Sequence, residues 1–152
     1  MAAKTYNIKG LNRALRKLGP EASAQLRDAS ILIATHVADE AKARALRAPG
    51  PAHLVAPSIK ARRDRVPVVV MGSSRRLPAR YGKPRTGDRQ LVRDVMWGAE
   101  FGGKARTTTQ QFATWRGSSS TAGYFLYPAV RDHAADTGTE YSEALDAALQ
   151  AI

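Results

Sequence analysis

The stretch that decides the fold is residues 95–130, which read VMWGAEFGG at 95–103, FATWRG at 112–117 and GYFLYPAV at 123–130. Both tryptophans, all three phenylalanines and two of the five tyrosines lie within it. Large aromatic side chains contribute heavily to protein cores and to interfaces. We therefore predict that this stretch forms a packing hub or an interface, built from Trp97, Glu100, Phe101, Tyr124, Phe125, Tyr127 and Pro128.

The length and composition of the chain limit the classes of protein to consider. A chain of 152 residues fits a single domain, 1–152, that buries roughly 70% of its unfolded surface. It contains no cysteine, which excludes disulfides and thiolate metal sites. No apolar run approaches the ~20 residues that span a bilayer, and the N-terminus lacks the apolar core of a secretion signal. We therefore expect a protein made in the cytoplasm, with no membrane partner.

The net charge of +11 is unevenly distributed along the chain. Residues 60–93 carry eleven Lys/Arg side chains against two aspartates, which gives a net charge of +9. Residues 107–152 carry two arginines against five carboxylates, which gives −3. Such an asymmetry indicates a polyanionic ligand, an acidic partner or contact between copies of the same protein.

The N-terminal third of the sequence predicts two helices. Apolar residues recur at helical spacing from Ile8 to Leu18, and Gly19-Pro20 ends that segment. Residues 21–48 contain no Pro or Gly, are rich in alanine and carry one apolar stripe. At about 42 Å this second helix is longer than a compact domain of this size needs. We expect it to lie across a sheet and to project beyond it.

The middle of the chain predicts a small sheet. Residues 66–71 form the clearest strand, and Pro67 requires either an edge position or a strand that begins just after it. We predict a β-hairpin from Ile59 to Met71. Residues 91–101 fit either a short helix or a strand, and residues 107–114 have the composition of a strand.

The C-terminal part of the sequence predicts two more helices. The chain is expected to become helical at Tyr124 and to remain so through Ala135. Gly138 should interrupt it, and Thr139 with Glu140 should cap a final helix.

Residues 72–93 form the predicted basic arm, an extended loop with no regular period from Gly72 to about Gln90. A loop of this length is usually functional or disordered until bound. Three interpretations remain open: a solvated loop, contact with a phosphate backbone, or docking onto an acidic protein surface, such as the acidic C-terminal region of the next copy. Only Tyr81 is interleaved with the charges, which disfavours stacking on single strands. The basic residues that we expect to act in assembly are Arg75, Arg76, Arg80, Lys83 and Arg85.

The sequence lacks a recognisable catalytic constellation. His36, His53 and His133 lie far apart and show no metal-ligand spacing. Glu100 is the one carboxylate inside the aromatic stretch, and acid–base catalysis would need a second titratable partner. We expect Glu100 to have a structural role or to pair with an arginine of a neighbouring chain. We expect no enzymatic activity, no metal and no cofactor.

Four segments, taken in order, resemble the neck or tail-completion proteins of long-tailed bacteriophages. These segments are the long helix 21–48, Ser58-Ile59, Trp97-Gly-Ala-Glu100-Phe101-Gly102 and Phe125-Leu-Tyr-Pro128-Ala129. The ordered set covers nearly the whole chain. The chain departs from the family at 51–57, where a Thr-Gly-x-Leu segment is common, and its 72–93 arm is longer than usual.

The resemblance implies a fold, an assembly and a location. The fold would be α+β, with long N-terminal and C-terminal helices packed on a small antiparallel sheet. The assembly would be a six-fold homo-oligomeric ring around the DNA channel, between a head connector or stopper and a tail tube or terminator protein. The ring would lie in the virion at the head–tail junction and would touch DNA non-specifically. Two alternatives stay open: a basic, sequence-independent nucleic-acid-binding protein, and a minor tail protein.

Overall fold

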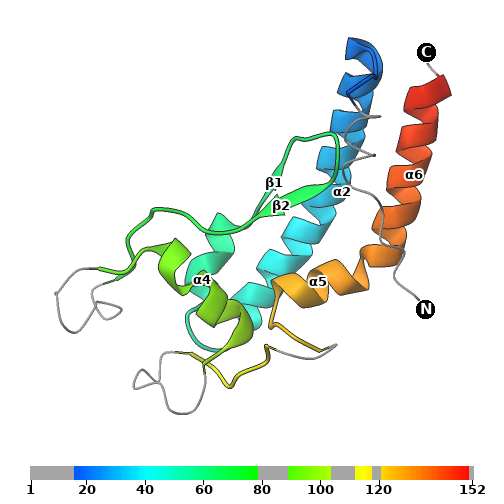
Figure 1. Ribbon diagram of the computed structural model, residues 1–152. Helices are drawn as coiled ribbons and strands as arrows, with labels where there is room; N and C mark the ends of the chain where they lie inside the picture. Colours follow the sequence, from blue (N-terminus) through cyan, green and yellow to red (C-terminus); the bar gives the residue numbers. More distant parts are fainter. Residues whose placement is uncertain (1–15, 79–88, 104–111, 118–120, 151–152) are drawn as a thin grey trace.

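The computed structural model describes residues 16–78, 89–103, 112–117 and 121–150 (Figure 1). Over these residues the fold is α+β, as the sequence predicted, with long helices and a two-stranded antiparallel sheet. The elements in chain order are α2 (Pro20–Arg47), α3 (Ala52–Val55), the 3-10 turn η1 (Ala56–Ser58), β1 (Lys60–Arg62), β2 (Val68–Val70), α4 (Val92–Phe101), α5 (Leu126–Asp132) and α6 (Ala134–Gln150).

Helix α2 confirms the long helix predicted over residues 21–48. It begins with Pro20 at the first helical position and carries Glu21 in its first turn, where the positive end of the helix dipole favours a carboxylate. The predicted stripe is buried from Ala22 through Ala45, apart from Ala29, which is half-buried. The helix crosses the hairpin as expected, but its N-terminal half does not project freely, because α6 packs along it (Figure 1).

The β-hairpin also confirms its prediction. β1 pairs with β2 in antiparallel register, with Lys60 opposite Val70 and Arg62 opposite Val68. β2 begins directly after Pro67, so the proline does not interrupt the strand pairing. Just before the hairpin, the buried Ser58 hydroxyl donates to the Val55 carbonyl at 2.6 Å and accepts from the Gly72 amide at 3.0 Å. Ser58 therefore ties the two ends of the hairpin together.

The two ends of the basic arm lie side by side. The amide of Leu77 donates to the Gln90 carbonyl at 2.8 Å, and the amide of Val92 donates to the Arg75 carbonyl at 3.0 Å. Arg76 faces Leu91 in this short antiparallel bridge, and the Leu77 side chain is fully buried. Residues 79–88 lie outside the described residues. The arm is therefore closed at its base, and its last two residues belong to α4.

The ambiguous segment 91–101 is a helix. The Asp94 carboxylate accepts a hydrogen bond from the Leu91 amide at 3.0 Å, which caps the start of α4. Its buried side chains, Val92, Val95 and Ala99, recur at helical spacing. The predicted strand at 107–114 and the predicted helix at 8–18 lie mostly outside the described residues.

The expectation for the C-terminal helices was wrong in two respects. Helix α5 ends at Asp132, before the predicted end at Ala135. His133 has a turn conformation, which changes the direction of the chain so that α6 can run alongside α2 (Figure 1). Gly138 does not interrupt α6, which is continuous from Ala134 to Gln150. A glycine inside a helix costs about 1 kcal/mol relative to alanine. Packing of α6 against α2, through Tyr141, Leu145 and Ala148, offsets that cost.

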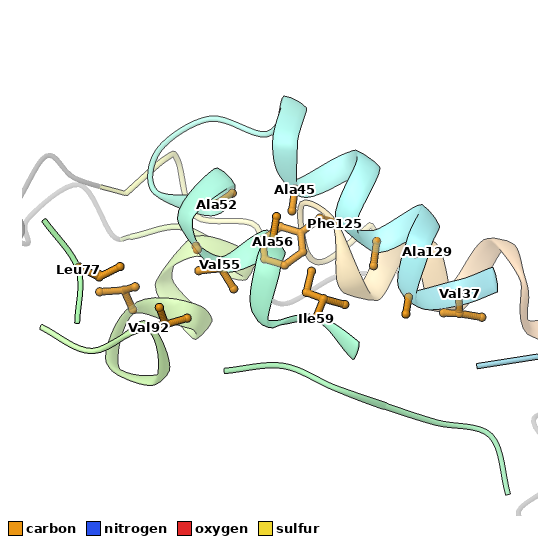
Figure 2. Packing of buried hydrophobic residues seen from close by; sticks show 14 residues of the cluster. Val37, Ala45, Ala52, Val55, Ala56, Ile59, Leu77, Val92, Phe125 and Ala129 are labelled. Carbon is orange, nitrogen blue, oxygen red and sulfur yellow. The ribbon is translucent and has the colours of Figure 1, made fainter. Parts of the chain in front are cut away.

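The buried apolar residues form two clusters. The larger one joins the C-terminal half of α2 to α3, α4 and α5 (Figure 2), and Phe125 is its largest fully buried side chain. The smaller one joins Ala22 and Leu26 at the start of α2 to Ala148 near the end of α6. The predicted aromatic stretch therefore lies at one end of the molecule, and the end of α6 lies at the other.

Candidate functional site

The centre of the predicted hub is the fully buried carboxylate of Glu100, on the last turn of α4. One of its oxygens accepts from the backbone amides of Phe125 at 3.3 Å and Leu126 at 2.9 Å. The other accepts from the amide of Tyr127 at 2.8 Å. These amides start helix α5 and have no partner within that helix. Glu100 therefore caps α5 from α4, 25 or more residues away in the sequence.

Burial raises the pKa of the Glu100 carboxyl above its ordinary value of 4.5. The three backbone amides and the positive charge of Arg131 act in the opposite direction. The structure thus assigns Glu100 the structural role that was one of its two predicted roles. No paired titratable group accompanies it in the described residues.

Two glycines allow close approaches of the chain around the end of α4. Gly123 has a φ of +85°, and a Cβ there would overlap a carboxylate oxygen of Glu100. Gly102 has a φ of +79°, and a Cβ there would overlap the carbonyl oxygen of Thr114. In addition, the amide of Tyr124 donates to the Glu100 carbonyl at 2.8 Å. The backbone at both ends of residues 102–123 is therefore fixed against the end of α4.

The predicted hub residues divide into a buried and an exposed set. Glu100 and Phe125 are fully buried, and Phe101, Tyr124 and Pro128 are half-buried. Trp97 is 53% exposed and Tyr127 is 46% exposed. The single hub that the sequence predicted is thus a core on one side and a surface on the other.

Four rings form one continuous aromatic face: the exposed Trp97, Trp115 and Tyr127, with the half-buried Phe101 between them. The rings of Trp97 and Phe101 are stacked, with centroids 6.0 Å apart. Phe101 also contacts Tyr127 edge-on at 4.9 Å and Trp115 at 6.4 Å. Trp115 is itself 45% exposed. Contiguous apolar patches of this kind mark interaction sites more often than scattered apolar residues do.

Three exposed arginines accompany the aromatic face. Arg93 precedes Trp97 by four residues on α4, and Arg131 follows Tyr127 by four residues on α5. Arg116 follows Trp115 directly, and its guanidinium lies 4.4 Å from the centre of the Tyr124 ring. The Arg131 guanidinium donates to the Ala122 carbonyl at 2.7 Å. The face is therefore apolar with a basic margin.

An apolar groove of about 590 Å³ adjoins the aromatic face at Tyr127. It lies between α2, β2, α5 and α6. Its lining consists of Ala34, Val37, Pro67, Val69, Leu126, Tyr127, Val130, Ala134 and Thr137. The groove extends the exposed apolar surface from α4 toward the middle of the molecule.

The described residues of the basic arm are partly used by the fold. The Arg75 guanidinium donates to the Leu54 carbonyl at 2.6 Å, while Arg76 is exposed in the bridge at the base of the arm. Arg80, Lys83 and Arg85 lie outside the described residues. Sequence reasoning did not select Trp115, Arg93 or Arg131. The spacing of Arg93, Trp97 and Phe101 by four residues each is the signal that would have indicated a shared helix face.

The described part of the chain holds no group of three His, Asp or Glu side chains that could bind a metal ion. None of its helices has the length and apolar character that a membrane span requires. No family model, curated protein or solved structure significantly matches this chain.

Proposed function

We propose that this chain is a structural protein of the phage neck that assembles as a ring around the DNA channel and docks between the head connector and the tail tube. It acts by binding to neighbouring proteins, without catalysis and without a cofactor. Its place is the head–tail junction of the virion, after assembly in the host cytoplasm.

The observation that carries the proposal is the contact between the two aromatic motifs of the resemblance. Glu100, from the first motif, holds three backbone amides at the start of the second. The two aromatic segments that resemble the family therefore form one structural unit rather than two separate short matches. The exposed aromatic face beside this unit supports a protein that functions by docking.

The proposal is tested by disrupting the gene in its phage. Filled heads and separate tails should accumulate, and purified protein should restore their joining. Immunogold labelling of intact virions should mark the head–tail junction. Labelling along the tail would favour a minor tail protein instead, and normal virions without the gene would contradict the proposal.

The role of the basic arm can be tested separately. Deleting residues 79–88 leaves the pairing at the base of the arm in place, so the variant should fold. Loss of joining by this folded variant would show that the arm acts in assembly. Full joining activity would exclude such a role for it.

The exposed basic residues of the hairpin and the arm favour a second candidate, a sequence-independent nucleic-acid-binding protein. Lys60, Arg62, Arg76 and Arg89 are all exposed. Such side chains bind phosphates irrespective of sequence, and the affinity falls steeply with salt. Tight, salt-dependent binding of the purified protein to random-sequence DNA, without ring formation, would favour this candidate over the first.

A further inference from the structure

The outward face of α6 is acidic along its whole length. Residues 134–150 contain no Lys or Arg. The four carboxylates are exposed, and no ion pair involves them within the described residues; they are Asp136, Glu140, Glu143 and Asp146. Their spacing places them on one side of the helix, opposite the side chains that pack on α2. We call this surface the acidic face.

The acidic face is also smooth. Within residues 135–147, its exposed side chains between and beside the carboxylates are small: Ala135, Thr139 and Ala147. Small residues allow the backbone of a helix to approach a flat partner closely. A row of aromatic rings is such a partner, and arginines beside the rings would meet the carboxylates.

The aromatic face has these properties. Trp97, Trp115 and Tyr127 are each about half exposed, at 53%, 45% and 46%. Each has an exposed arginine close to it in the sequence. Arg93 lies one helical turn from Trp97, Arg116 is next to Trp115, and Arg131 lies one helical turn from Tyr127. Interface hot spots are enriched in Trp, Tyr and Arg, and charge complementarity fixes the register of two partners.

The aromatic face and the C-terminal end of the acidic face lie at opposite ends of α2. The aromatic face belongs to the cluster in which Phe125 packs near Ala45 (Figure 2), whereas the end of α6 packs on Ala22. Ala22 and Ala45 are 23 residues apart on α2, which is about 35 Å at about 1.5 Å per residue. One copy can therefore use both faces at the same time, as a heterologous contact repeated by rotation requires.

We propose that the aromatic face of one copy binds the acidic face of α6 on the next copy, and that this contact builds the ring. Trp97 and Tyr127 cover the small residues of α6. The three arginines beside the aromatic face pair with the carboxylates; they are Arg93, Arg116 and Arg131. The inference rests on the proposed function for the ring, and it assigns the subunit contact to the aromatic face instead of the basic arm.

The test uses two variants of the full chain that each remove one face. The first carries Arg93→Ala with Trp97→Ala, and the second carries Glu140→Lys with Glu143→Lys. All four side chains are exposed, and circular dichroism melting verifies that both variants fold. Matched controls are Leu32→Ala and Asp39→Lys, which change an exposed leucine and an exposed aspartate on α2.

Size-exclusion chromatography with light scattering measures the mass of each sample. The wild-type chain and both controls should form oligomers, while each face variant should be monomeric. An equimolar mixture of the two variants should give a dimer and nothing larger, because each pair retains one intact aromatic face and one intact acidic face. Association in the mixture should be at least about tenfold tighter than in either variant alone.

The other outcomes overturn the inference in distinguishable ways. If both face variants still form oligomers, the contact lies elsewhere and the ring function stands. If both are monomeric but the mixture gives no dimer, the two faces do not bind each other. If the wild-type chain is monomeric at every concentration tested, the inference and the ring function fail together.

Discussion

The two sides of the aromatic stretch face different surroundings although their residues alternate along the chain. Glu100 and Phe125 are fully buried, whereas Trp97 and Tyr127, two or three residues away, are about half exposed. The inner side fixes the position of α5 on α4. The outer side contributes less to the fold, and its rings remain available to a partner. Burial therefore divides one concentration of aromatic residues into a core and an exposed surface.

The largest expected effect comes from truncating the inner side. Phe125→Ala should lower the free energy of unfolding by about 3–5 kcal/mol, because it empties the centre of the larger core. Trp97→Ala, the matched change on the outer side, should cost about 1 kcal/mol or less. Urea unfolding of both variants measures the difference. Equal losses would show that the two sides contribute alike to stability.

Removal of the buried carboxylate should have the next largest effect. Glu100→Ala leaves three backbone amides without their acceptor, which should cost about 2–4 kcal/mol. Urea unfolding measures this loss, and Glu140→Ala on the exposed face of α6 is the control that should leave the midpoint unchanged. If Glu100→Ala unfolds at the same urea concentration as wild type, water bonds the three amides as well as the carboxylate does, and the prediction is wrong.

Replacement of two glycines by alanine should change the free energy of unfolding in opposite directions. Gly138→Ala should raise the free energy of unfolding by about 0.5–1 kcal/mol, because the position is inside a helix and a Cβ there meets no atom within 4 Å. Gly123→Ala should lower it, since its positive φ strains an L residue and its Cβ would overlap Glu100. Thermal melting of the two variants tests this, and destabilisation by Gly138→Ala would contradict the continuous α6.

The smallest expected effect is a pH dependence that originates at Glu100. Burial raises the pKa of this carboxyl in the folded state above 4.5, so the folded protein binds the proton more tightly than the unfolded chain does. The stability from Glu100 should therefore be fully present below pH 4.5 and be lost as the pH rises through the folded-state pKa. Urea unfolding of wild type and of Glu100→Gln as a function of pH isolates the contribution of this carboxyl, because glutamine does not titrate. Wild type should lose stability relative to Glu100→Gln as the pH rises, and a gain in its relative stability would contradict the raised pKa.

The sequence predicted the elements whose signals are local. Helix α2 lies between Gly19-Pro20 and Pro49-Gly50, and the hairpin strand begins where Pro67 requires it to begin. These boundaries follow from backbone restrictions of single residues. The α+β class follows from them directly.

The sequence could not predict the features that depend on distant contacts. Residues 91–101 fitted a helix or a strand equally well until the packing of Val92, Val95 and Ala99 decided between them. The continuity of α6 through Gly138 depends on its contact with α2. The role of Glu100 depends on amides 25 or more residues away, and no local pattern indicates such a pairing. Exposure of Trp97 beside buried Glu100 is likewise a property of the packed structure.

The closed base of the basic arm allows the length of the intervening segment to vary. Twelve residues separate Leu77 from Gln90, whose backbones are bonded to each other. Doubling the length of a segment closed in this way costs only about 0.6 kcal/mol in chain entropy. Insertions and deletions between these two residues would therefore leave the core nearly as stable as before. A peptide tag inserted between these two residues would therefore be a practical handle for labelling the chain.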